Sequence, residues 1–239
     1  GRQADPAGRA GTVKLKEIVV TATQRVEPVQ SVPFQVTAMT AHDLTRIDAH
    51  NLGDFAAYVP GLITNSGAAP GLIVIRGVTM GTGGQLSSAI GLYLDGVPLG
   101  ASTSFGLGYQ SFNVNTFDLD RVEVLNGPQG TLYGADSLGG AVRYETAPPD
   151  PHTLHAVAET EISHTEHGGT NYGLRGMVNL PFGAGLGALR IDAIDNHDSG
   201  YMRNPVYHRD NQGATRNEGG RVQLLLTPVS DLDIRLGVF

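Results

Sequence analysis

Four histidines lie close together in the sequence, at His152, His155, His164 and His167. Imidazole nitrogens are common ligands of zinc and other transition metals. The spacing of His164 and His167 falls in a strand-and-loop context and not on one face of a helix, so the pattern does not direct their side chains to a common point. We therefore expect surface histidines and predict no metal site here.

Three aspartates follow at intervals of three residues, Asp192, Asp195 and Asp198, and carboxylates are ligands that calcium prefers. Side chains alternate along an extended strand, so Asp192 and Asp195 are expected on opposite faces, and a shared calcium ion would require a bend. The sequence has no Gly-x-Ser-x-Gly nucleophile motif and no cysteine. We predict no catalytic residue.

Two glycine-rich segments, residues 79–88 (TMGTGGQLSS) and 101–111 (ASTSFGLGYQS), have the composition of phosphate-binding loops. In nucleotide-binding proteins such a loop follows a strand and opens a helix within a βαβ unit. Neither segment does so, and we predict no cofactor. An enzyme with a glycine-rich loop stays as an alternative, which tight binding of ATP or NAD would support.

Composition narrows the partners. The net charge of −7, with only two lysines, makes nucleic acid an unfavourable partner. No apolar run reaches the roughly 18 residues of a transmembrane helix, whereas transmembrane strands leave only a weak alternating signal. Residues 1–16 are polar and predicted to form a flexible arm. The sequence ends in a strand pattern, LDIRLGVF, so we expect a part of a longer protein.

Short elements are expected over the first half of the chain. Residues 32–38 alternate as a strand, and Thr40 with Asp43, then Asn51 with Asp54, form capping boxes that predict two short helices. Residues 72–78 (LIVIRGV) read as an apolar strand. Asp-Gly within residues 91–99 (GLYLDGVPL) predicts a hairpin, because both turn positions favour φ > 0.

The segment from Arg121 to Tyr144, RVEVLNGPQGTLYGADSLGGAVRY, holds five glycines and a proline. It starts as a strand with Val122 and Val124 on one face and Arg121, Glu123 and Leu125 on the other. Glycine and proline restrict the path that follows. A second strand is predicted from Ala141 to Tyr144.

The last third of the chain changes character after the proline-rich linker at residues 148–153. Five segments alternate, with apolar side chains on one face and charged or amide side chains on the other. They cover residues 154–163, 171–180, 188–196, 221–227 and 231–239. The connections alternate between short turns and longer polar loops. A ten-residue strand tilted by about 40–45° spans the roughly 25 Å apolar band of an outer-membrane barrel, although a soluble sandwich shows the same alternation.

These motifs resemble the TonB-dependent outer-membrane receptors. Residues 121–144 are similar to the end of that family's plug domain, IRG at residues 75–77 and YLDGV at residues 93–97 are similar to two other plug elements, and residues 17–22 (EIVVTA) are similar to the TonB box. Asn126 departs from the pattern, which usually has arginine there. The resemblance covers a whole plug but only the beginning of a 22-stranded barrel.

The resemblance implies a domain order. It is a flexible arm (1–16), a TonB box (17–22), an α+β plug with a small mixed sheet and short helices (25–147), a linker (148–153) and about five antiparallel transmembrane β-barrel strands (154–239). It also implies three groups of site residues. The TonB-binding residues are Glu17, Ile18, Val19, Val20, Thr21 and Ala22. The plug–barrel ion-pair network is Arg76, Arg121 and Glu123, and the ligand-facing loop residues are Gln85, Ser87, Tyr109 and Gln110.

The function implied by the resemblance is energised uptake across the outer membrane of a Gram-negative bacterium. The partners are then TonB, outer-membrane lipid and a small-molecule ligand. A ferric siderophore is the leading ligand, with cobalamin, a glycan or another organic nutrient as alternatives. From the alternation alone, a secreted β-rich binding module also stays open; it would remain soluble without detergent.

Overall fold

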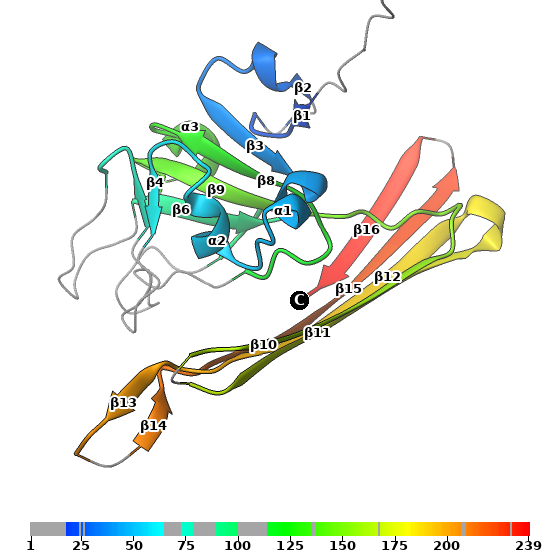
Figure 1. The fold of residues 1–239 in the computed structure, drawn as a ribbon. Coiled ribbons are helices and arrows are strands. Elements are labelled where there is room, and N and C mark those ends of the chain that lie inside the picture. Colours follow the sequence, from blue (N-terminus) through cyan, green and yellow to red (C-terminus); the bar gives the residue numbers. More distant parts are fainter. Residues whose placement is uncertain are drawn as a thin grey trace, which may run out of the picture.

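The computed structural model describes residues 18–23, 25, 27–64, 73–78, 89–99, 114–134, 137–166, 168–206, 209–229 and 231–239. Two five-stranded sheets dominate these residues. Figure 1 shows the smaller N-terminal sheet, with its helices, beside a long and curved C-terminal sheet. No helix of the described part has the length and apolar character needed to cross a membrane.

The N-terminal sheet has the order β3-β8-β9-β6-β7. All neighbours are antiparallel except β6 and β9, which run parallel. The strands are β3 (Val36–Thr40), β6 (Ile90–Leu94), β7 (Val97–Pro98), β8 (Leu119–Asn126) and β9 (Gly140–Thr146). The sheet is therefore mixed, as predicted. The hairpin between β6 and β7 is confirmed, with positive φ at both Asp95 and Gly96.

Three short helices accompany this sheet: α1 (Ala41–Arg46), α2 (Leu52–Ala56) and α3 (Gly130–Tyr133). Both predicted capping boxes are present. Thr40 and Asp43 close one at the start of α1, and Asn51 and Asp54 close the other at the start of α2. These side chains satisfy amide groups that the first turn leaves without partners.

Both faces of the N-terminal sheet are buried. Val122 and Val124 of β8 point into the main core, where Phe55 of α2 and Tyr144 of β9 pack edge to face. The opposite face carries Leu125 in a second core cluster. The predicted division of the two faces of β8 is therefore confirmed. The second cluster also contains residues from the N-terminal strand, described below.

Several shorter elements complete the first half. They are β1 (Val19–Val20), β2 (Glu27–Pro28), η1 (Val29–Ser31), β4 (Leu62–Thr64) and β5 (Ile73–Ile75). The strand predicted at residues 32–38 begins only at Val36, and that at residues 72–78 is limited to β5. The second strand ends early because Arg76 and Gly77 both have positive φ, which breaks an extended path.

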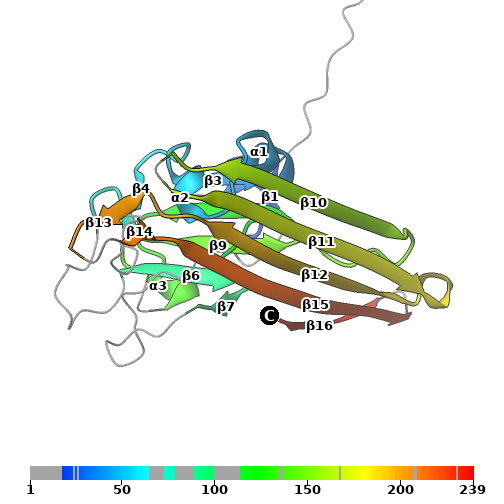
Figure 2. The ribbon, with the colours of Figure 1, turned by 60° about the horizontal axis from the view of Figure 1, so that its bottom comes forward.

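The C-terminal sheet is an antiparallel meander in the order β10-β11-β12-β15-β16, and Figure 2 shows the strands side by side in this order. Its strands are β10 (His155–His164), β11 (Thr170–Phe182), β12 (Gly187–Asp198), β15 (Thr215–Val229) and β16 (Leu232–Val238). All five predicted strands are present. The turn between β11 and β12 contains η3 (Gly183–Gly185).

The connection between the strands predicted at residues 188–196 and 221–227 is shorter in the structure than predicted. β15 already begins at Thr215, and part of the remaining connection forms a separate hairpin of β13 (Met202–Asn204) and β14 (Arg209–Gln212). The polar residues 215–220 gave no apolar alternation. These residues nevertheless pair with residues 193–198 of β12, and this pairing extends β15 through them.

The C-terminal sheet has its polar face inside and its apolar face outside. Arg190, Asp192 and Arg221 are buried, and Asn179 is completely so. On the opposite face, apolar side chains are exposed. They include Ile162, Leu174, Leu180, Val222, Leu236 and Val238. A water-soluble sheet has the opposite arrangement, with its apolar face buried. Buried polar and exposed apolar side chains match a sheet whose outer face meets lipid.

Candidate functional site

A completely buried carboxylate lies at the centre of the candidate site. Glu123 of β8 is 0% exposed. Its Oε1 accepts a hydrogen bond from Arg121 Nε at 2.7 Å, and its Oε2 accepts one from Arg143 Nη1 at 2.9 Å. The sheet register produces this geometry, because Glu123 lies opposite Arg143 and Arg121 lies opposite Glu145. A buried charge is costly unless it is paired and hydrogen-bonded, and both conditions hold here.

The N-terminal strand is attached to this carboxylate through Thr21. The Thr21 backbone N–H donates to Glu123 Oε1 at 2.7 Å, and the hydroxyl donates to the same oxygen at 3.3 Å. The hydroxyl oxygen accepts from Arg121 at 3.0 Å and from Arg143 at 2.9 Å. One small side chain therefore contacts all three charged groups.

Two tyrosines hold the next residue. The Tyr133 hydroxyl of α3 donates to the Ala22 carbonyl oxygen at 2.8 Å, and the Tyr93 hydroxyl donates to the Tyr133 carbonyl oxygen. The two rings meet edge to face with centroids 5.1 Å apart. The guanidinium of Arg143 lies 5.5 Å from the centroid of the Tyr133 ring, within the range of a cation–π contact.

We call Thr21, Arg121, Glu123, Tyr133 and Arg143 the Glu123 clasp. Val20 and Ala22, on either side of Thr21, are fully buried in the second core cluster, whereas Ile18 and Val19 are 39% and 42% exposed. Among the described strands, β1 pairs with β2, through Val19 with Pro28 and Val20 with Glu27. The N-terminal strand is thus folded back on its own chain and bound side-on to the N-terminal sheet.

Burial shapes the protonation of the clasp. It raises the pKa of the Tyr133 hydroxyl to about 12, so this group stays a hydrogen-bond donor. Burial also raises the pKa of Glu145, although Arg143 opposes this. For Arg121, burial is the largest single influence and acts to lower the pKa, but the hydrogen bonds and charges of Glu123, Asp120 and Glu145 together outweigh it, and the net direction is upward. The guanidinium therefore stays charged.

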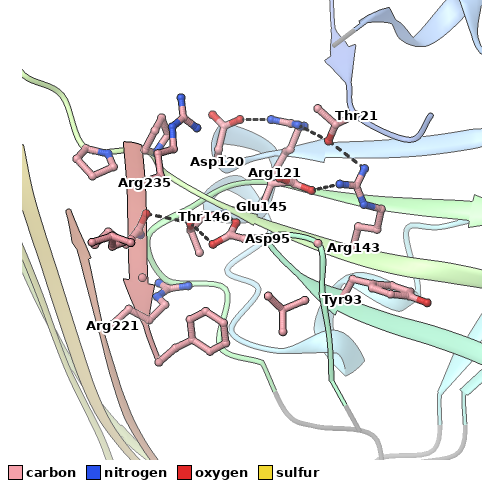
Figure 3. Close-up of a pocket in the computed structure, with 18 of the residues that line it drawn as sticks. Thr21, Tyr93, Asp95, Asp120, Arg121, Arg143, Glu145, Thr146, Arg221 and Arg235 are labelled. Carbon is pink, nitrogen blue, oxygen red and sulfur yellow. Dashed lines mark hydrogen bonds and ion pairs between the residues drawn. The ribbon is translucent and has the colours of Figure 1, made fainter. Parts of the chain in front are cut away.

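A cavity of about 920 Å³ separates the clasp from the C-terminal sheet. Thr21, Arg121 and Arg143 line one side, and Arg221 and Arg235 of β15 and β16 line the other. Figure 3 shows the chain of contacts from Asp120 through Arg121, Thr21 and Arg143 to Glu145 along this space. The clasp is thus open to the region between the two sheets.

Separate contacts fasten the two sheets to each other. Arg190 of β12 forms a two-pronged ion pair with Asp118, with hydrogen bonds of 2.8 and 2.5 Å. Arg221 of β15 pairs with Asp192 and also donates to the Phe117 carbonyl oxygen. The alternation of the sequence predicted a charged face on these strands. It gave no means of finding Asp118, because the pair is separated by 72 residues.

The structure brings together only some of the predicted network. Arg121 and Glu123 meet in the clasp, whereas Arg76 lies apart from them, exposed at the end of β5. Arg143 belongs to the clasp but was not among the predicted network residues. Asn126, where arginine was expected, is buried, and neither polar atom of its side chain has a partner in the described part of the protein.

Other predicted site residues lie outside the described residues. These are Glu17 at the start of the N-terminal strand and the loop residues Gln85, Ser87, Tyr109 and Gln110. Their roles stay predictions.

The aspartates of β12 do not gather around one point. Asp192 pairs with Arg221 and Asp195 with Arg216, so each carboxylate has its own cation. The expected alternation explains this, because the two side chains lie on opposite faces of the strand.

Comparison with known proteins places these features in a family. Residues 28–141 match the family model described as the TonB-dependent Receptor Plug Domain. The chain is 32% identical over 215 residues to the pesticin receptor of Yersinia pestis, covering 88% of this chain and 30% of that receptor. It is 25% identical over 174 residues to the vitamin B12 transporter BtuB of Vibrio vulnificus, covering 71% of this chain and 27% of that protein.

A solved structure supports the same placement. The crystal structure of the ferric yersiniabactin uptake receptor FyuA from Yersinia pestis superposes with a TM-score of 0.68 at 28% identity, covering 82% of this chain and 29% of that one. The chain spans less than a third of the length of these relatives. The N-terminal sheet with its helices is a plug domain, and the C-terminal sheet consists of barrel strands. The chain belongs to the TonB-dependent receptors of the Gram-negative outer membrane.

Proposed function

We propose that this chain is the plug and the first barrel strands of a receptor that takes up a scarce ligand into the periplasm by an energised, non-enzymatic route. The observation that carries the proposal is the clasped N-terminal strand, docked beside a sheet with an inverted polarity. A strand that a partner pulls on must have a defined docked position and must be able to dissociate from it. The Glu123 clasp provides the docked position, and because its contacts with the strand are few, the strand can be released.

TonB is the proposed partner of residues 17–22. Binding by strand addition uses the backbone N–H and C=O groups of an extended segment. In the clasp, the Thr21 N–H is already bonded to Glu123 and the Ala22 carbonyl to Tyr133. The strand therefore exchanges these partners for TonB, and the docked form is the form not yet engaged.

A ferric siderophore is the proposed ligand. The pesticin receptor and the ferric yersiniabactin uptake receptor are among the relatives, and the name of the second states its cargo. The match to a vitamin B12 transporter keeps cobalamin as the second candidate. The ligand is expected to contact the plug loops that carry Gln85, Ser87, Tyr109 and Gln110.

The test is uptake by a deletion strain that carries the full-length receptor or its Val20→Pro variant. Proline removes a backbone donor from the pairing strand, so we expect ligand to bind at the cell surface but not to enter. Ala10→Pro, outside the predicted TonB box, is the matched control and should transport normally. A panel of iron chelates, cobalamin and glycans identifies the cargo.

Two results would contradict the proposal. Transport by Val20→Pro at the normal rate would remove the coupling role of the strand. Recovery of the full-length protein in the soluble fraction without detergent would favour a secreted binding module instead.

A further inference from the structure

A second polar cluster lies where the plug meets the first barrel strand. His50 Nε2 is 3.4 Å from Asp48 Oδ1 and 3.3 Å from Glu161 Oε2. One ligand atom from each of the three residues lies within 4.8 Å of the other two. Asp48 and His50 come from the turn between α1 and α2, and Glu161 comes from β10. The cluster therefore bridges the two domains of the chain.

The backbone on the plug side of the cluster is well fixed. The His50 N–H donates to Asp54 Oδ2 at 2.7 Å, as part of the capped start of α2, and the His50 carbonyl accepts from the Thr116 N–H at 3.2 Å. Asp48 has a φ of 53°, a conformation that aspartate adopts more readily than most residues. Glu161 lies in the middle of β10, paired with Gly173. Ligands on such anchored segments are held in place before a metal binds.

The separations suit a tetrahedral metal. Zinc bonds to histidine nitrogen and carboxylate oxygen are about 2.0–2.2 Å, which places neighbouring ligands of a tetrahedron roughly 3.3–3.5 Å apart. The two distances from His50 Nε2, 3.4 and 3.3 Å, fall in this range. Histidine nitrogen and carboxylate oxygen are both ligands that zinc accepts, and imidazole suits zinc, copper, iron and nickel.

The charge around the cluster also favours a dication. Asp48, Glu159 and Glu161 are three carboxylates, and among the described residues Arg175 is the guanidinium that pairs with Glu159 and Glu161. Arg175 Nη2 donates to Glu161 Oε2 at 2.8 Å, and a carboxylate oxygen can accept such a bond while it binds a metal. The contact of Arg175 with His50 Nε2 is longer, at 3.4 Å, and is the one that a metal would replace.

We propose that Asp48, His50 and Glu161 bind a divalent transition metal of the zinc class and thereby fasten the plug to the first barrel strand. A water molecule completes the coordination from the adjoining cavity of about 460 Å³. Arg175 stays on Glu161 and orients it. The spacing of histidines in the sequence gave no hint of this site, because its plug and barrel ligands are more than 100 residues apart.

The experiment is titration of Zn²⁺ into the full-length receptor in detergent, after removal of metal with a chelator. Calorimetry is run on the wild type, on Asp48→Asn and on His50→Ala. Asp48→Asn removes the charged ligand while keeping a residue that tolerates positive φ. His42→Ala is the matched control, because His42 is exposed on α1 and outside the cluster. Binding of Co²⁺, read from its visible absorption, reports whether the coordination is tetrahedral.

We expect one zinc equivalent to bind at least tenfold more weakly to both cluster variants, with no change in His42→Ala. The cobalt spectrum should lose its tetrahedral bands in the same two variants. The proposal is overturned if the wild type shows no saturable zinc binding, or if all three variants bind zinc as the wild type does. Because metal binding is read directly, these outcomes do not depend on transport or on TonB.

Discussion

Thr21 contacts the three charged groups of the clasp through a single hydroxyl and its backbone N–H. Arg121 and Arg143 each have carboxylate partners besides it, so the ion pairs survive without Thr21. Removing Glu123 has a larger effect than removing Thr21. Two poorly exposed guanidinium groups then lose their shared carboxylate, a change that typically lowers the stability of the fold by about 3–5 kcal/mol. At this scale, Glu123 maintains the structure and Thr21 maintains the docking.

Thr21→Val is therefore the substitution that separates docking from stability. It removes three hydroxyl contacts and keeps the backbone bond to Glu123, so we expect docking to weaken by about 1–2 kcal/mol. The readout is the maleimide labelling rate of Ala22→Cys, a position that is fully buried when docked. The rate should rise roughly tenfold, since about 1.4 kcal/mol is a factor of ten. Thr45→Val, on the exposed side of α1, is the control. An unchanged labelling rate would show that the hydroxyl does not hold the strand.

The capping box of α1 gives a prediction in pH. Hydrogen bonds from the Thr40 side chain and backbone lower the pKa of Asp43. A carboxylate with a lowered folded-state pKa adds stability above its unfolded value of about 3.9 and loses it as the pH falls through the folded value. Asp43→Ala should cost about 1 kcal/mol at pH 7 and much less below pH 3. Thermal unfolding of the receptor in detergent, with the exposed Asp231→Ala as control, measures this. An equal cost at both pH values would exclude the charge as the cause.

The tight junction between β8 and β9 depends on one glycine. A Cβ on Gly140 would lie 2.3 Å from the Leu125 carbonyl oxygen, at a φ of +147°. Gly127 also has positive φ, +91°, but a Cβ there meets nothing within 4 Å. We expect Gly140→Ala to cost roughly 3 kcal/mol or more, since the strands must separate, and Gly127→Ala about 1 kcal/mol. The yield and melting temperature of the receptor give both values. Equal effects would contradict this account of the junction.

Elements with local causes were predicted well, and contacts between distant elements were not. The two capping boxes, the Asp95–Gly96 hairpin and the two faces of β8 follow from residues a few positions apart. The clasp joins Thr21 to residues 100–122 positions away. Alternation showed that Arg121 and Glu123 share a face. It gave no indication that the N-terminal strand covers this face, because docking is decided by tertiary packing.

The inverted polarity of the barrel strands makes a prediction for the whole molecule. Val222 is at the middle of β15 and 44% exposed, and Tyr201 is outside the long strands and 70% exposed. In lipid, Val222→Arg should cost about 2–4 kcal/mol, because arginine at the midplane of a bilayer is unfavourable. Tyr201→Arg, at a position expected near the interface, should cost about 0–1 kcal/mol. Folding into vesicles, followed by denaturant titration, measures the difference. In water, both substitutions would be nearly neutral, so similar values would argue against a lipid-facing sheet.

Sequence alone left the lipid-facing sheet and the soluble sandwich undecided, since both alternate. The decision comes from what covers each face. The plug covers the polar face through Asp118, Phe117 and Thr146, and the apolar side chains of the other face are exposed. No pattern within one strand contains this information. It depends on two domains meeting.

The antiparallel arrangement of β1 and β2 sets how the molecule resists a mechanical load. Ile18 and Val29 lie at the same end of the hairpin, where the Val29 N–H donates to the Ile18 carbonyl oxygen. A pull on the N-terminus therefore opens the hairpin like a zipper, one bond at a time and at low force. At Thr21 the load falls at once on Glu123, Arg121 and Arg143. The N-terminal strand would therefore separate at low force over its first residues and would need a much larger force at Thr21. Forces below that value would leave the plug closed.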